Sequence, residues 1–437
     1  ISDGLSQNTV NCILQDKHGL MWFGTKDGLN RYDGYSFRIF KKESGNDNKI
    51  GNSYITTLYE DQNKLWVGTV NGLYIYDMER EIFRGLEAMT DDDTQIIYPI
   101  NTITQDSDSI FWISTEGQGV FSYNEKNQEL KQHMALDGST NLSTVRNLNI
   151  DDSGTIWFSF GTRGLHFTND KFTTIQSYEL KNGGNAYSGE IISDMIFNEQ
   201  GILYVLSNRS GFSKLNIERQ EKTFLNENLL QDRTFLRKII QASPGEFWIG
   251  SETGIYIYNE ATSSITHLAH LDSDPYSLSD NAIHSLFMDR DEGIWIGSYF
   301  GGINYYPKQY SYFEKFYPTD ENGLQGRRIR EFVEDENGDI WIGTEDAGLH
   351  LYSTDEKRIR RMAENRIHSN IHGLCIDGNY LWIGTYSQGL FRMNIESGKI
   401  EHLLDISEKN IYTIHKVNLG DIWIGGGSSL HKYINTS

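Results

Sequence analysis

All nine tryptophans of this 437-residue chain occupy one position of one repeated segment, and this regularity constrains the fold more than any other feature. In each copy the Trp is followed by one apolar residue and then by Gly or Ser, as in Trp22-Phe23-Gly24. The tryptophans are Trp22, Trp66, Trp112, Trp157, Trp248, Trp295, Trp341, Trp382 and Trp423, and Tyr204 stands in the one copy without Trp. A residue type confined to one slot of a repeat indicates a packing requirement of that repeat.

The repeat is 41 to 47 residues long and occurs ten times, which is typical of four-stranded propeller blades. In the first copy we predict strands over residues 10–15, 20–25, 29–32 and 35–40, with glycine-containing turns before the second and third. No long stretch shows a strong 3.6-residue apolar period, so long helices are not expected. The fold class is therefore predicted to be all-β, a β-propeller in which each Trp fills the space between adjacent blades.

The ten repeats divide most simply into seven and three. Residues 1–320 are predicted to form a seven-bladed propeller, whose last blade takes its fourth strand from 312–316. A segment like the chain's opening then recurs at 320–326, so 321–437 is predicted to hold the first three blades of a second, incomplete propeller. Three blades leave unpaired edges, so we expect the chain to be part of a longer protein. The alternative is a single ten-bladed ring.

The net charge of −21 argues against nucleic acid and anionic membrane surfaces as partners of this region, because both attract basic patches. No apolar run reaches the 18 residues of a spanning helix, so any signal peptide or membrane anchor is expected outside this chain. The two cysteines, Cys12 and Cys375, are expected to be free core thiols. No Cys/His cluster has zinc spacing, and no cofactor or metal is predicted.

Three motifs in the first repeat resemble a known family. They are the opening Gly4-Leu5-Ser6-Gln7, the Gln15-Asp16-x-x-Gly19-x-x-Trp22-Phe23-Gly24-Thr25 core, and Gly28-Leu29-Asn30-Arg31-Tyr32. They are similar to the two-component regulator propeller repeat found at the start of hybrid two-component sensors of gut Bacteroidetes. The resemblance implies a periplasmic sensor region that detects an oligosaccharide, forms a homodimer, and signals through a membrane helix and a histidine kinase that lie outside this chain.

A ligand is expected where two sets of variable positions meet on one face of the first propeller. One set follows the leading apolar residue of each first strand, and the other lies in the turn after each Trp strand. Arginine suits carboxylates and diols, and aromatic rings suit sugar faces. The candidate ligand-binding residues are Asn11, Thr56, Asn101, Arg146, Arg163, Arg209, Arg237, Glu252, His284, Tyr299 and Phe300.

Other functions were weighed on the same residues. A protein-interaction or dimerisation propeller is the main alternative to a ligand sensor. A glycan-cleaving enzyme is a weaker third, because the sialidase-like turn Asp151–Trp157 is structural and no spacing selects a nucleophile or a close carboxylate pair. No catalytic residue is predicted.

Overall fold

The fold was analysed in a computed structural model of the chain. It describes residues 4–43, 49–91, 93–133, 144–226, 235–272, 274, 276–308, 316, 324–326, 328–364, 366–404, 406–417 and 421–434. These residues form ten antiparallel sheets and no helix, which confirms the all-β prediction. The chain divides into two compact units, 1–310 and 311–437. The predicted boundary at residue 320 lies outside the described residues, and of the predicted strand over 312–316 only Phe316 is described, outside any strand.

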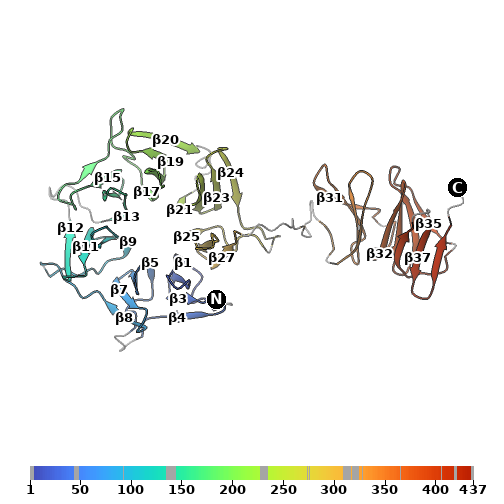
Figure 1. Cartoon of the computed structure of the whole chain (residues 1–437), viewed down its shortest axis with the longest axis horizontal. Coiled ribbons are helices and arrows are strands. Elements are labelled where there is room, and N and C mark those ends of the chain that lie inside the picture. The colour runs from blue at the N-terminus through green and yellow to red at the C-terminus, as the bar shows by residue number, and fades with distance from the viewer. Residues whose placement is uncertain are drawn as a thin grey trace. The chain divides into compact units, whose positions relative to one another are not determined.

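The first unit is a ring of seven sheets, each with its first strand nearest the centre (Figure 1). Its strands are β1 (Val10–Gln15), β2 (Met21–Thr25), β3 (Gly28–Tyr32), β4 (Phe37–Phe40); β5 (Ile55–Asp61), β6 (Lys64–Thr69), β7 (Gly72–Asp77), β8 (Ile82–Gly85); β9 (Ile100–Gln105), β10 (Ile110–Thr115), β11 (Val120–Asn124), β12 (Glu129–His133); β13 (Val145–Ile150), β14 (Ile156–Phe160), β15 (Leu165–Thr168), β16 (Gln176–Ser177); β17 (Ile192–Phe197), β18 (Ile202–Ser207), β19 (Gly211–Asn216), β20 (Glu221–Asn226); β21 (Leu236–Ser243), β22 (Glu246–Ser251), β23 (Gly254–Asn259), β24 (Ser264–Leu268); β25 (Ile283–Met288), β26 (Ile294–Ser298) and β27 (Ile303–Tyr306).

The ring closes between its seventh and first sheets. The Ser285 hydroxyl in β25 donates to the Val10 carbonyl in β1 at 3.0 Å, and the Thr9 hydroxyl donates to the Tyr299 carbonyl at 2.7 Å. The rings of Trp295 and Phe23 lie 5.5 Å apart across the same boundary. The seventh sheet, and not the tenth, therefore lies beside the first.

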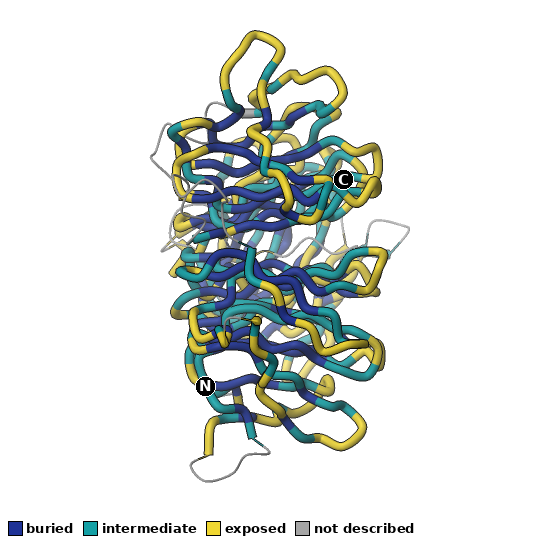
Figure 2. Tube along the Cα trace, turned by 90° about the vertical axis from the view of Figure 1, so that its left-hand side faces the viewer, coloured by how far each residue is buried: buried dark blue, intermediate teal, exposed yellow. Residues whose placement is uncertain are grey.

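The second unit contains three sheets of the same design. Its strands are β28 (Ile329–Glu334), β29 (Ile340–Thr344), β30 (Leu349–Ser353), β31 (Arg358–Met362); β32 (Ile371–Asp377), β33 (Tyr380–Thr385), β34 (Gly389–Asn394), β35 (Ile400–Leu403); β36 (Ile411–Lys416), β37 (Ile422–Gly426) and β38 (Leu430–Tyr433). In the first unit the buried stretches follow the strands and the exposed stretches are mostly connecting loops (Figure 2).

Two features explain which residues surround the repeated Trp in the sequence: a hydrogen bond from its indole and close packing at the glycine that follows it. The indole N–H of Trp22 donates to Asp16 Oδ2 at 2.7 Å, while Asp16 Oδ1 accepts the backbone N–H of Leu20 and so shapes the turn. Four other tryptophans use an Asp six residues earlier in the same way: Trp112, Trp157, Trp295 and Trp341. The Gly two residues after Trp22 is needed because a Cβ on Gly24 would lie 2.4 Å from Cys12 Sγ. The predicted core role of the Trp is confirmed for seven of the nine, which are buried.

Candidate ligand-binding site

Every first strand carries a β-bulge at its second residue. In β1, Val10 pairs with Thr25 and Cys12 pairs with Gly24, so Asn11 between them is an extra residue without a pairing partner. The same register shift occurs in all ten described sheets. Bulges re-aim side chains and are frequent beside binding sites. The bulged residues are Asn11, Thr56, Asn101, Arg146, Ser193, Arg237, His284, Arg330, His372 and Tyr412.

In nine of the ten described sheets a backbone hydrogen bond fixes a second position next to the bulge. The residue four places after the Trp donates its N–H to the carbonyl two places before the bulge, as in Glu252 to Phe235 at 3.2 Å and Tyr299 to Ala282 at 2.8 Å. This contact ties the loop after the second strand to the start of the first strand. The two predicted sets of variable positions therefore meet in these nine sheets.

Two of the predicted ligand-binding side chains, those of Asn11 and Asn101, instead form hydrogen bonds to the neighbouring sheet. Asn11 Nδ2 donates to the Ile55 carbonyl at 2.7 Å, and Asn101 Nδ2 donates to the Val145 carbonyl at 2.9 Å. The Thr56 hydroxyl is buried and has no hydrogen-bond partner among the described residues. The two asparagine amides are thus used between sheets and the Thr56 hydroxyl is buried, so none of the three belongs to the site.

The predicted arginines of the fourth and fifth sheets are dispersed. Arg146 pairs with Glu116 of the third sheet at 3.4 Å, and both side chains are about half exposed. The guanidinium of Arg163 lies 5.5 Å from the Phe160 ring, and Arg209 is exposed in the turn between β18 and β19. The structure does not bring these residues to the other predicted contacts.

Side chains of the sixth, seventh and first sheets do come together. Arg237 Nε donates to Glu252 Oε1 at 2.7 Å, and the rings of His284 and Tyr299 lie 4.9 Å apart. Lys26 Nζ donates to the Tyr299 hydroxyl at 2.6 Å. We call these five residues, Lys26, Arg237, Glu252, His284 and Tyr299, the Arg–His cluster.

The electrostatics of the cluster keep His284 neutral. Burial first, and then the positive charge of Arg237, lower the pKa of His284 to about 4, although the charge of Glu252 opposes the shift. Near neutral pH its imidazole therefore offers one donor and one acceptor without a charge. Arg237 and Glu252 supply further donors and acceptors beside it.

Aromatic rings border the cluster on both sides. Phe300 is 70% exposed and its ring lies 4.5 Å from that of Tyr299. The exposed ring of Phe235 lies 5.3 Å from the Arg237 guanidinium. Polar groups that converge between apolar ring faces are typical of sites for small polar ligands.

The site includes two residues outside the list of candidates, Lys26 and Phe235, although Lys26 lies in one of the predicted variable turns. Lys26 lies four residues after Trp22, the same offset as Glu252 and Tyr299 from their own tryptophans. This shared offset could have identified Lys26 as a site residue from the sequence. Phe235 precedes its strand, and nothing in its local sequence marks it.

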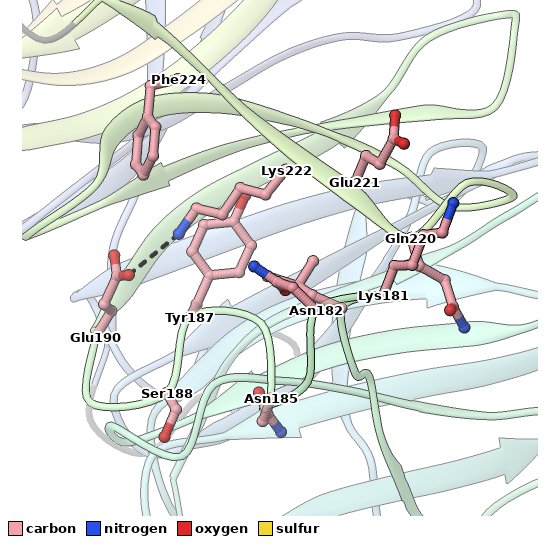
Figure 3. Close-up of a pocket in the computed structure, with 11 residues that line it drawn as sticks. Lys181, Asn182, Asn185, Tyr187, Ser188, Glu190, Gln220, Glu221, Lys222 and Phe224 are labelled. Atoms are coloured by element: carbon pink, nitrogen blue, oxygen red, sulfur yellow. Dashed lines mark hydrogen bonds and ion pairs between the residues drawn. The ribbon is translucent and has the colours of Figure 1, made fainter.

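A separate hollow of about 640 Å³ lies beside the fifth sheet, between segment 180–190 and β20 (Figure 3). Lys222 Nζ lies 3.2 Å from Glu190 Oε1, and both side chains are only about a tenth exposed. Lys222 also donates to Ser210 Oγ at 2.6 Å and sits 3.7 Å from the centre of the Tyr187 ring. The charges of Glu190 and Lys222 compensate each other, which indicates that this pair holds segment 180–190 in place.

The described residues contain no helix long and apolar enough to cross a membrane.

Comparison with protein families identifies the repeat. The two-component regulator propeller model matches residues 4–27, 49–71, 277–300 and 323–346. A curated relative, histidine kinase P4 of Formosa agariphila, is 28% identical over 323 residues, a match that covers 70% of this chain and 23% of the relative. The chain thus spans under a quarter of that protein's length.

Solved structures share the fold. The extracellular domain of the putative hybrid two component system BT3049 from B. thetaiotaomicron matches with a TM-score of 0.68 and 18% identity, over 100% of this chain and 70% of that one. The corresponding domain of BT4673 from the same organism matches with a TM-score of 0.59 and 18% identity, over 99% and 64%. A streptogramin B lyase matches at 0.52 and 12% identity, over 69% and 95%. At these identities the likeness concerns the fold alone, which enzymes and sensors share.

Proposed function

This chain carries the two-component regulator propeller repeat, and we propose that it is the ligand-sensing region of a hybrid histidine kinase and response regulator. The region works in the periplasm, detects an oligosaccharide, and controls genes for polysaccharide use. The kinase activity, the membrane anchor and the homodimer belong to the full-length protein. The named relative supports this proposal, because a kinase of this kind needs an input region.

The Arg–His cluster is the observation that carries the ligand proposal. Arg237 donates and Glu252 accepts hydrogen bonds, so the pair is suited to two neighbouring hydroxyls of a sugar. Tyr299 and Phe300 offer ring faces to the apolar side of a pyranose. His284 is neutral near pH 7, so a sugar without charge meets no uncompensated charge on that side.

The signal follows from differential binding. A ligand that binds one arrangement of propellers or protomers more tightly than another shifts the population toward it, and the membrane helix reports the shift. Because the cluster joins three sheets of one ring, a bound sugar would link the seventh sheet to the first, where the ring closes.

Calorimetric titration tests the proposal. The chain is titrated with maltohexaose, cellohexaose, xylohexaose, mannohexaose and oligogalacturonate. Binding to one of them is expected to weaken about tenfold or more in Arg237→Ala and His284→Ala, because each removes groups that contact the sugar directly. Circular dichroism and thermal melting check that the variants fold.

Arg146→Ala is the comparison variant, because Arg146 has the same bulge position in the fourth sheet and lies outside the cluster. We expect it to leave affinity within about twofold. Loss of binding in Arg146→Ala but not in the other two variants would move the site to the fourth sheet. A folded chain that binds no probe would favour the protein-interaction function instead.

A further inference from the structure

The second unit repeats the side-chain pattern of the Arg–His cluster. In the sixth and seventh sheets the bulged residues are Arg and His, and the residues four places after the Trp are Glu and Tyr. In the eighth and ninth sheets the bulged residues are again Arg330 and His372, and the residues four places after the Trp are again Glu345 and Tyr386. No other two consecutive repeats of the sequence carry this combination.

The contacts within the two sets are also alike. Arg330 Nη2 lies 3.0 Å from Glu345 Oε2, as Arg237 pairs with Glu252. The rings of His372 and Tyr386 lie 5.8 Å apart, compared with 4.9 Å for the pair in the first unit. The backbone N–H groups of Glu345 and Tyr386 make the same loop-to-strand bonds, each 3.0 Å long. We call Arg330, Glu345, His372 and Tyr386 the second cluster.

The tyrosine rings at the second cluster are exposed. Tyr386 is 43% exposed, and Tyr412, the bulged residue of the tenth sheet, is 45% exposed with its ring 5.5 Å from that of His372. The two rings thus form an exposed aromatic surface beside His372. His372 Nε2 is itself buried and has no hydrogen-bond partner among the described residues. A buried polar atom of this kind is costly unless something pairs with it.

One difference sets the two clusters apart. In the first unit Lys26, four residues after Trp22, covers the ring of Tyr299 with its ammonium 3.9 Å from the ring centre. In the second unit the residue four places after Trp423 is Gly427, which has no side chain. No cation at that position covers the ring of Tyr386, and Tyr412 adds a further aromatic face.

We propose that the second cluster, with Tyr412, is a second binding site for a neutral saccharide, so that one chain binds two sugar units of the same class. The inference rests on the proposed function of the Arg–His cluster. Arg330 and Glu345 bind neighbouring hydroxyls, a sugar ring stacks between Tyr386 and Tyr412, and a hydroxyl pairs with His372 Nε2.

Titration of the full 437-residue chain with the same five oligosaccharides tests the inference through stoichiometry. We expect two saccharide sites in the unaltered chain, and one site in Arg330→Ala/His372→Ala. The altered chain should keep the affinity of the remaining site within about twofold. Arg358→Ala, which changes an exposed arginine of the same sheet in β31, is the matched control and should retain both sites.

The outcomes separate the two proposals. One site that is lost in Arg237→Ala and untouched by Arg330→Ala/His372→Ala overturns the second site and keeps the first. No binding to any probe overturns both. If the double variant does not fold, hydrogen–deuterium exchange on the unaltered chain decides: a bound probe must protect both 283–300 and 371–387, and protection of 283–300 alone contradicts the inference.

Discussion

The first sheet of the closed ring and the eighth sheet have matching apolar faces with opposite exposure. In the first sheet Ile13, which pairs with Phe23, is buried beneath the seventh sheet, whose Trp295 packs on Phe23. In the eighth sheet Phe332, which pairs with Ile342, holds the same place and is 68% exposed. The repeat therefore supplies the apolar face, and only a neighbouring sheet buries it.

The Trp position shows the same contrast. Trp66 lies between the second and third sheets, is fully buried, and stacks on Phe111 at 3.9 Å. Trp423 in the tenth sheet is 36% exposed. Although both residues are Trp at the same position of the repeat, we expect Trp66 to contribute much more than Trp423 to the free energy of unfolding.

Replacing these two tryptophans by alanine is the largest expected effect. Trp66→Ala should lower the free energy of unfolding of the first unit by about 3–5 kcal/mol, because it removes a fully buried ring and leaves a cavity. Trp423→Ala should lower that of the second unit by much less, since part of its ring is already in water. Denaturant unfolding followed by fluorescence, with the two units fitted as separate transitions, measures both. Equal losses would contradict the comparison.

A second contrast concerns ion pairs. Glu190 and Lys222 in the first unit are almost buried, whereas Glu356 and Arg360 in the second are about half exposed. Burial alone would raise the pKa of Glu190, but hydrogen bonds from Ser207 and Ser210 and the charge of Lys222 lower it below its usual value. The surrounding groups thus favour the charged form of Glu190.

Glu190→Gln should therefore destabilise the first unit by about 3 kcal/mol, because it leaves the buried Lys222 ammonium without its counter-charge. Glu356→Gln, the matched exposed change, should cost about 0–1 kcal/mol. A carboxyl whose pKa is lowered on folding contributes stability above its unfolded pKa, and this contribution is lost as pH falls through the folded value. Urea unfolding at several pH values should show this acid loss in the unaltered chain and less of it in Glu190→Gln.

Much of the fold could be predicted because similar turn residues recur along the repeats. The predicted first strand, residues 10–15, has the same bounds as β1. The predicted fourth strand, 35–40, starts two residues before β4 and ends with it. In five repeats an Asp six residues before the Trp marks the turn directly in the sequence. By contrast, which face stays exposed depends on which sheets pack together, and no single repeat encodes that.

The candidate site was predictable only in part. The sequence located the polar bulge positions, yet it did not distinguish Asn11, whose amide ties two sheets, from His284, which lies in the cluster. The difference depends on how far a neighbouring carbonyl lies from the side chain, which is a tertiary distance. The pair of Glu190 and Lys222 was not foreseen because it requires segment 180–190 to fold back onto β20.

The smallest expected effect compares His284 with His372. Burial and the nearby arginine lower the pKa of both imidazoles, that of His284 to about 4. A histidine with a lowered pKa binds fewer protons in the folded than in the unfolded state, so stability falls as pH drops from about 6.5 toward 4. NMR titration of the histidine ring protons should show both His284 and His372 titrating below 6.5, with assignments from His284→Gln and His372→Gln.

Saccharide binding should weaken over the same acid range, because a charged imidazole beside Arg237 or Arg330 raises the cost of closing the site around a neutral sugar. One electrostatic difference between the two clusters is Lys26, which adds a positive charge near His284 and has no counterpart at Gly427. Lys26→Met should therefore bring the pKa of His284 closer to that of His372. If the pKa of His284 does not rise in Lys26→Met, or if it is already near 6.5 in the unaltered chain, the expected effect of the Lys26 charge on His284 is contradicted.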